Sequence, residues 1–168
     1  MTVVDIFKEI VSKTETALQK KGFDKTINYQ YGHINDIVNV LLQYKSQNIE
    51  ARKYPLIALI QPFSEQEIER KDISKEVTLR ILICANSRKD ATPSLRYDKN
   101  FTDVIHEIEK EFINQIKISK YFENNYLEPT YSASDDWGEN RELSDYIDIR
   151  NITNLKLKLR KFYCKPQN

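Results

Sequence analysis

The sequence predicts an α+β fold, with a mainly antiparallel sheet of about four to six strands packed against an N-terminal helix and a long third helix. Apolar residues recur at helical spacing in three segments and alternate along several strand-like segments. The strand-like segments follow one another through hairpin-like links, which favours antiparallel pairing. The length of 168 residues fits one domain, so we expect residues 1–168 to share a single core.

The first two helices and the first strand are predicted from short-range signals. Thr2 and Asp5 form a capping-box-like start, and Gly22 supplies a left-handed residue at the end of the first helix. A short strand follows at KTINYQYGH, and a second helix is expected over about 35–47. The stripes expected to be buried are Val3, Ile6, Phe7, Ile10, Val11, Thr14, Ala17 and Leu18, then Ile37, Val38, Leu41, Leu42 and Tyr44.

Two further strands are expected in the middle of the chain. The unbroken apolar run 56–60, between Pro55 and Pro62, predicts a central strand covered on both faces. The charged stretch 64–75 is read as a loop or an exposed hairpin. Residues 75–87 alternate regularly and predict a strand with one buried face.

The second half is expected to hold a loop, the third helix and the terminal strands. Residues 87–100 look the most loop-like, with Asn100 as the cap of a helix that starts at Phe101. Residues 126–131 are a candidate strand. The alternating segment 147–159 is either one long strand or two strands joined near 151–154.

Composition excludes several classes of protein. With 40% hydrophobic residues, 11% aromatic residues and a net charge of +1, the chain is neither disordered nor a bulk coat for nucleic acid. No apolar run approaches the roughly 20 residues of a membrane span, so no membrane partner is expected. The N-terminus lacks signal-peptide character, which makes a reducing cytoplasm the expected place of synthesis.

No decisive catalytic motif is present, so we expect no enzymatic activity, no cofactor and no metal. The three glycines stand apart from one another, and neither a phosphate loop nor a nucleophile elbow occurs. Cys84 is expected to be a buried apolar residue, and Cys164 does not make a disulfide framework with it. His106 is expected to pack half-buried on the third helix, and His33 to lie at a turn or a helix start.

Acidic residues leave two alternatives open. Asp135, Asp136 and Glu139 are read as a polar loop, with a divalent metal as the less favoured reading. A nuclease would use Asp72 and Glu76 with Arg80, but Thr stands at position 78 where such sites normally carry Lys.

The candidate interface residues are cationic or aromatic. Every charged side chain from Arg150 onward is cationic, and Lys156, Lys158 and Arg160 are expected to share one face of the last strand. That face is either solvated or meets an acidic protein or passing DNA. Trp137 lies in a polar segment, as an anchor or as a contact for a partner. Arg88 and Arg96, in the predicted loop 87–100, complete the set.

The order of these elements resembles the tail-completion or tail-terminator proteins of tailed bacteriophages. The resemblance rests on an amphipathic N-terminal helix, the strand KYPLIALIQPF, an alternating strand, the helix FTDVIHEIEKEFINQI and late strands. It is a resemblance of pattern over most of the chain. It implies a virion protein of the tail and neck, assembled in the host cytoplasm as a homo-oligomeric ring of about six or more copies.

The resemblance also implies the partners. The ring would join or terminate the tail at the head-side connector and contact neighbouring neck, connector or tail proteins through the loops 64–75 and 87–100. DNA would pass through without sequence-specific binding. The alternatives are a non-enzymatic adaptor or binding protein of a phage or mobile element, and, third, the metal-dependent nuclease.

Overall fold

The computed structural model describes residues 2–68, 74–87, 90, 92–123, 129–134 and 146–160. These residues form a five-stranded sheet in the order β1-β2-β3-β5-β4. The strands are β1 (Asn28–Gly32), β2 (Leu56–Ile68), β3 (Ser74–Asn86), β4 (Thr130–Ser134) and β5 (Ile147–Leu159). The α+β class and the mainly antiparallel sheet are confirmed. Among the strands of the described residues, β1 and β2 are the one parallel pair.

Helix α1 (Val3–Gln19) begins and ends where the sequence predicts. The backbone N–H of Asp5 donates to the Thr2 hydroxyl at 3.2 Å, and the Thr2 N–H donates to the Asp5 carboxylate at 2.9 Å. This capping box satisfies N–H groups that have no partner inside the first turn. Gly22 has a φ of +93°, the left-handed conformation expected after the helix.

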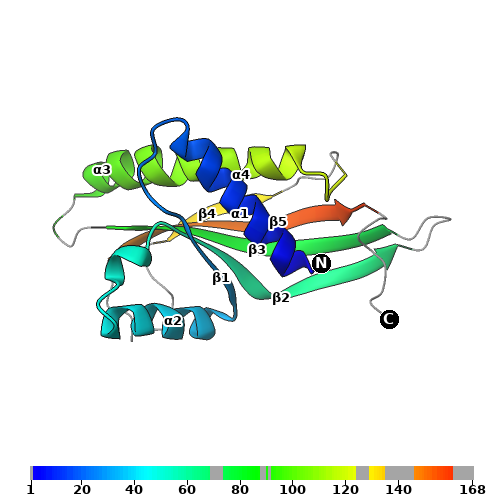
Figure 1. Cartoon of the computed structure of the whole chain (residues 1–168), viewed down its shortest axis with the longest axis horizontal. Coiled ribbons are helices and arrows are strands. Elements are labelled where there is room, and N and C mark those ends of the chain that lie inside the picture. Colours follow the sequence, from blue (N-terminus) through cyan, green and yellow to red (C-terminus); the bar gives the residue numbers. More distant parts are fainter. Residues whose placement is uncertain are drawn as a thin grey trace.

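Helices cover the two faces of the sheet unequally (Figure 1). Helices α1 and α4 (Glu107–Ile118) lie on one face, and α2 (Ile34–Ser46) lies on the other with the short helix η1 (Glu50–Arg52) after it. The larger core contains Ile57, Leu59, Ile81 and Ile83 from the sheet, and the smaller one contains Leu56, Ala58, Leu82 and Cys84.

The central strands differ from expectation in two respects. The run in β2 is buried on both faces as predicted, but β3 is the middle strand of the sheet. The expectation of one buried face for β3 holds near Thr78 and Arg80 and is wrong at Leu82 and Cys84. Those two side chains belong to the smaller core, which packs against α2.

The charged stretch after Pro62 is a hairpin excursion rather than a loop. Strand β2 continues to Ile68, and β3 begins at Ser74. The pairing register shifts between Ile60 and Ser64, which carries the strand past Pro62. The hairpin extends beyond the helices at one end of the molecule (Figure 1).

The prediction of a loop over 87–100 is wrong for residues 93–100. Helix α3 (Pro93–Arg96) starts there, with the Thr92 hydroxyl accepting from the Leu95 N–H at 3.3 Å and Pro93 in the first turn. It continues through the π-helical segment η2 (Tyr97–His106) into α4. Asn100 therefore lies inside the helical segment and does not cap it. None of the helices in the described part of the chain has the length and apolar character that a bilayer crossing needs.

The last strand, β5, is one long strand, as the first of the two alternatives predicts. Asn154 has a φ of +55°, and the register against β3 shifts between Leu79 and Ile81. This irregularity moves the apolar positions from one face of the sheet to the other without a turn, because Ile147 and Ile149 pack in the smaller core whereas Leu155 and Leu157 pack in the larger one. Strand β4 overlaps the expected 126–131 only at Thr130 and Tyr131, and residues 126–128 lie outside the described residues. The cysteine at 84 is buried as predicted, whereas Cys164 also lies outside them.

Replacing Leu41 by Ala tests the packing of α2 on the second face. Leu41 is fully buried in the smaller core, so we expect a loss of about 2–5 kcal/mol in the free energy of unfolding. Chemical denaturation measures this loss. The exposed residue Gln43, changed to Ala as the control, should change stability by less than about 0.5 kcal/mol. Equal effects of the two substitutions would contradict this packing.

The ion pair between Lys21 and Glu111 links the end of α1 to α4 and predicts a pH dependence. Lys21 Nζ lies 2.6 Å from Glu111 Oε2, and this hydrogen bond, with one from Gln115, lowers the pKa of Glu111. A carboxyl with a lowered folded-state pKa stabilises the fold above its unfolded pKa, and this contribution disappears as the pH falls through the folded value.

We therefore expect Lys21→Met to destabilise the protein at pH 7 and to have a smaller effect near pH 3. Denaturation midpoints at the two pH values measure this change. Lys20→Met, at an exposed position outside this ion pair, serves as the control and should change the midpoint little at either pH. A Lys21→Met effect of the same size at both pH values would rule out the carboxylate as its origin.

Candidate interface

One part of the sheet has no described helix over it. Helix α2 covers only part of the face on which it packs, and a polar region remains around the first half of β3 and the middle and end of β5. The residues there are half-buried, and a Lys or Arg in such a place can lay its aliphatic stem along the sheet while its charged end stays in water. We call this region the open face; it consists of Glu76, Thr78, Arg80, Asn151, Lys156 and Lys158.

The structure places two of the three predicted cations on the open face. Lys156 is opposite Thr78, and Lys158 is opposite Glu76. Lys158 also forms an ion pair with Glu123 at 2.9 Å, whereas Lys156 forms none with another described residue. The third cation, Arg160, donates from Nε to the Phe122 carbonyl at 2.9 Å. Lys156 is therefore the cation of this set most available to a partner.

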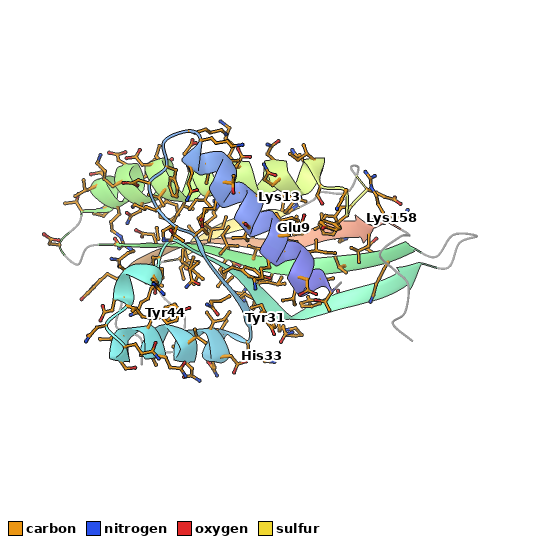
Figure 2. All side chains as sticks on the ribbon, viewed as in Figure 1. Glu9, Lys13, Tyr31, His33, Tyr44 and Lys158 are labelled. Carbon is orange, nitrogen blue, oxygen red and sulfur yellow. The ribbon has the colours of Figure 1, made fainter. Side chains whose placement is uncertain are left out.

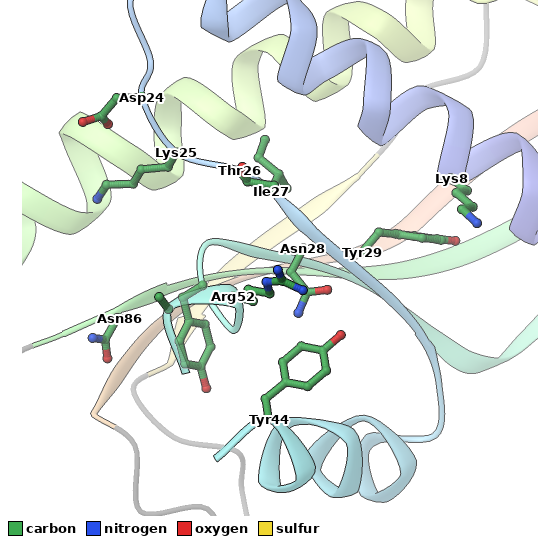
Figure 3. A pocket seen from close by; sticks show the side chains of 12 residues that line it. Lys8, Asp24, Lys25, Thr26, Ile27, Asn28, Tyr29, Tyr44, Arg52 and Asn86 are labelled. Atoms are coloured by element: carbon green, nitrogen blue, oxygen red, sulfur yellow. The ribbon is translucent and has the colours of Figure 1, made fainter. Parts of the chain in front are cut away.

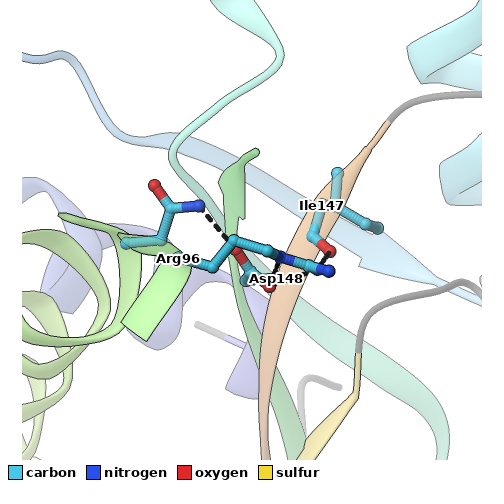
Figure 4. A network of polar contacts seen from close by, with 4 residues as sticks. Arg96, Ile147 and Asp148 are labelled. Carbon is cyan, nitrogen blue, oxygen red and sulfur yellow. Dashed lines mark hydrogen bonds and ion pairs between the residues drawn. The ribbon is translucent and has the colours of Figure 1, made fainter. Parts of the chain in front are cut away.

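Arg96 is engaged within the chain (Figure 4). Its guanidinium donates to Asp148 Oδ1 from Nε at 3.0 Å and from Nη2 at 2.5 Å, and Nη2 also reaches the Ile147 carbonyl. Asn100 donates to the other oxygen of Asp148. Asp148 lies on β5 and is only 2% exposed. Its charge-assisted hydrogen bonds with Arg96 and Asn100 join the helical segment to that strand. We leave Arg96 out of the interface proposed below.

Several predicted residues lie outside the part of the chain that the structure describes. These are Arg88, Trp137, Asp135, Asp136, Glu139 and Asp72. Of the nuclease set, Glu76, Thr78 and Arg80 lie on the open face, where Arg80 Nε donates to Asn151 Oδ1 at 3.1 Å. Within the described residues no group of three or more His, Cys, Asp or Glu side chains could hold a metal ion.

The two outer strands of the sheet are short and carry no charge. Strand β1 has the sequence NYQYG and β4 has the sequence TYSAS, in a chain with 30% charged residues. All five residues of β4 are exposed. Natural sheets usually protect an edge with lysines or prolines, because unpaired backbone groups invite a further strand. Neither edge strand carries such a residue.

The two edges also run in opposite directions. Strand β1 is parallel to β2, and each of the pairs β2–β3, β3–β5 and β5–β4 is antiparallel. Strand β4 therefore runs opposite to β1. If a second copy continued the sheet in the same orientation, β4 of one copy and β1 of the next would meet as an antiparallel pair, in which the hydrogen bonds between strands run perpendicular to them.

Two clusters of aromatic and charged groups were not predicted from the sequence. The Tyr131 ring on β4 lies under the Arg150 guanidinium, 4.6 Å from its centroid, and Arg150 pairs with Glu109 at 2.7 Å. The second cluster lies along η2, where the rings of Tyr97, Phe101 and His106 contact one another. His106 is half-buried there, as the sequence predicts. The first cluster joins three distant segments, and no short-range pattern signals it.

His33 lies at the start of α2, which is one of the two positions predicted for it. Figure 2 shows it close to Tyr31, at the turn between β1 and that helix. Its backbone N–H donates to the Asp36 carboxylate at 3.3 Å. The residue thus helps to end β1 and start the helix.

Comparison with models of known protein families finds no match for this chain, and no curated protein matches it.

The Arg96–Asp148 pair predicts a strong coupling between the two residues. Arg96→Gln leaves a buried carboxylate without its cation, and we expect a loss of about 2–4 kcal/mol in the free energy of unfolding. Adding Asp148→Asn should recover part of this loss, because the unpaired charge is then gone. A double-mutant cycle by chemical denaturation measures the coupling.

The exposed pair Lys99–Asp103 provides the control, and Lys99→Gln should cost less than about 1 kcal/mol. Additive effects of the Arg96 and Asp148 substitutions would contradict the network.

Proposed function

We propose that this protein is a structural subunit of a tailed-bacteriophage neck, a tail-completion or tail-terminator protein that forms a homo-oligomeric ring. The ring would join or end the tail at the head-side connector, contact neighbouring neck or tail proteins, and let DNA pass without sequence-specific binding. The pattern of elements described above suggests the class, and the proposed location is the virion. No enzymatic activity or cofactor is part of the proposal.

The observation that carries the proposal is the pair of uncharged sheet edges that run in opposite directions. Contact between β4 of one copy and β1 of the next is heterologous, and such contacts close into a ring when the rotation between copies divides a full turn. Backbone pairing alone can give affinity at such an edge. A pairing between two identical β4 edges would give a closed dimer instead.

Two further features suit a subunit that contacts other proteins. The β2–β3 hairpin extends past the helices, and the open face carries the cations Arg80, Lys156 and Lys158 against Glu76, with Lys158 also paired to Glu123. Figure 2 shows Lys158 toward that same end of the molecule. A neighbour with an acidic surface would complement this region.

The solution mass measured by light scattering over a range of concentrations tests the proposal. We expect a closed species of about six or more subunits, or steep concentration-dependent assembly toward one. The measurement is repeated with candidate neck and tail proteins added, because a ring can need a template to form. A monomer under all of these conditions would overturn the proposal and favour the adaptor alternative.

Proline substitutions in β4 test the edge itself. Alternate N–H groups of a strand point to opposite sides, so one of Ser132→Pro and Ala133→Pro removes a donor that points away from β5. That variant should keep the melting temperature of the wild type. The protein concentration that it needs for assembly should rise at least about tenfold. Lys117→Gln, an exposed change on α4, is the control. Full assembly of both proline variants would show that β4 is not the contact.

A further inference from the structure

A pocket of about 950 Å³ lies between α1, β1, α2 and η1 (Figure 3). Its volume falls within the range of about 300–1,000 Å³ that is usual for sites of small organic ligands. We call it the tyrosine pocket. It is lined by Lys8, Asp24, Lys25, Thr26, Ile27, Asn28, Tyr29, Tyr44, Ala51, Arg52, Tyr54 and Asn86.

The charges around the tyrosine pocket favour an anion. Lys8, Lys25 and Arg52 line it, against the single carboxylate of Asp24. None of the three cations forms a salt bridge with another described residue. Figure 3 shows the Arg52 side chain next to Asn28, with the Tyr44 ring across the same space. A guanidinium in this position can bind a phosphate through two parallel hydrogen bonds.

Three tyrosine rings supply flat apolar surface beside these cations. The Tyr29 hydroxyl donates to the Val4 carbonyl at 3.1 Å, and the Tyr44 hydroxyl accepts from Gln30 at 3.3 Å. These bonds hold two of the rings in place before any ligand arrives. Burial raises the pKa of Tyr29, so this hydroxyl stays neutral and adds no negative charge to the pocket. A planar heterocycle can stack on a ring held in this way. Every nucleic-acid base has such a flat face, so the stacking does not depend on which base is bound.

We propose that the tyrosine pocket binds a nucleoside phosphate, either as a free mononucleotide or as one unit of single-stranded DNA. The phosphate would lie against Arg52, with Lys25 and Lys8 elsewhere on the lining of the pocket, and the base would stack on the ring of Tyr44. This proposal does not rest on ring formation, although Asn28 and Tyr29 of the pocket belong to β1, one of the two edge strands. Tyr44 lies toward one end of the long axis and the open-face residue Lys158 toward the other (Figure 2).

Titration of the purified wild-type chain with deoxyadenosine monophosphate, followed by calorimetry or by NMR shifts, tests the proposal. Deoxyadenosine and inorganic phosphate are the two partial probes. We expect saturable binding of the nucleotide, and at least about tenfold weaker binding of each part, because the pocket is proposed to use both the cations and the rings. No saturable binding up to about 10 mM nucleotide would overturn the proposal.

Two variants and two matched controls locate the binding. Arg52→Gln and Tyr44→Leu should each weaken nucleotide binding at least about fivefold. Lys117→Gln and Tyr97→Leu remove the same kinds of group from exposed positions outside the pocket, and should change affinity less than about twofold. Circular dichroism and the melting temperature verify that each variant is folded. Binding that survives both pocket variants would place the ligand elsewhere and overturn the proposal.

A short 5′-phosphorylated single-stranded oligonucleotide distinguishes the two sources of the ligand. Binding tighter than that of the mononucleotide by at least about tenfold, with a steep dependence on salt, supports a DNA strand as the ligand. Equal affinities support a free nucleotide. In both cases Arg52→Gln must weaken binding. An oligonucleotide that binds equally well to this variant would contradict the assignment of the pocket.

Discussion

The fold depends on a sheet whose middle strands are apolar on both sides. Leu56 to Ile60 in β2, and Ile81 to Ala85 in β3, expose almost no surface to water. A sheet of this kind needs cover on both faces, because each exposed apolar face loses about 25 cal/mol for every Å² left in water. Helices α1 and α4 cover one face and α2 covers part of the other, and this gives three layers around two cores.

The incomplete cover on the second face determines what remains for partners. Beyond α2 the sheet changes from apolar to polar along β3 and β5, at Thr78, Arg80 and Lys156. The outer strands β1 and β4 then stand at the two edges without charges to protect them. Meanwhile, the Asp148 network fixes the long helical segment to β5. The two cores and the open face therefore follow from one distribution of apolar residues.

Patterns within a few residues predicted most of the fold, and the sites needed the tertiary structure. The capping box at Thr2 and the alternation in β5 are local signals, so they predict α1 and the extent of the last strand. The expectation that the apolar residues from Ile147 to Leu159 keep one face is wrong, because the irregularity near Asn154 moves them from the smaller core to the larger one. The helix start at Thr92 was missed because the cationic segment around it looked like a loop, although Thr92 followed by Pro93 is a helix-start signal. The tyrosine pocket joins residues from four elements, and no spacing along the chain signals that Lys8 and Arg52 line the same pocket.

Hydrogen–deuterium exchange of the outer strands, compared between dilute and concentrated protein, tests the central claim that the chain assembles through its sheet edges. The account predicts that amides of β4 and β1 exchange fast in the dilute sample and become protected together as the oligomer forms. Protection confined to other surfaces, or exchange at both edges that does not change with concentration, would contradict it.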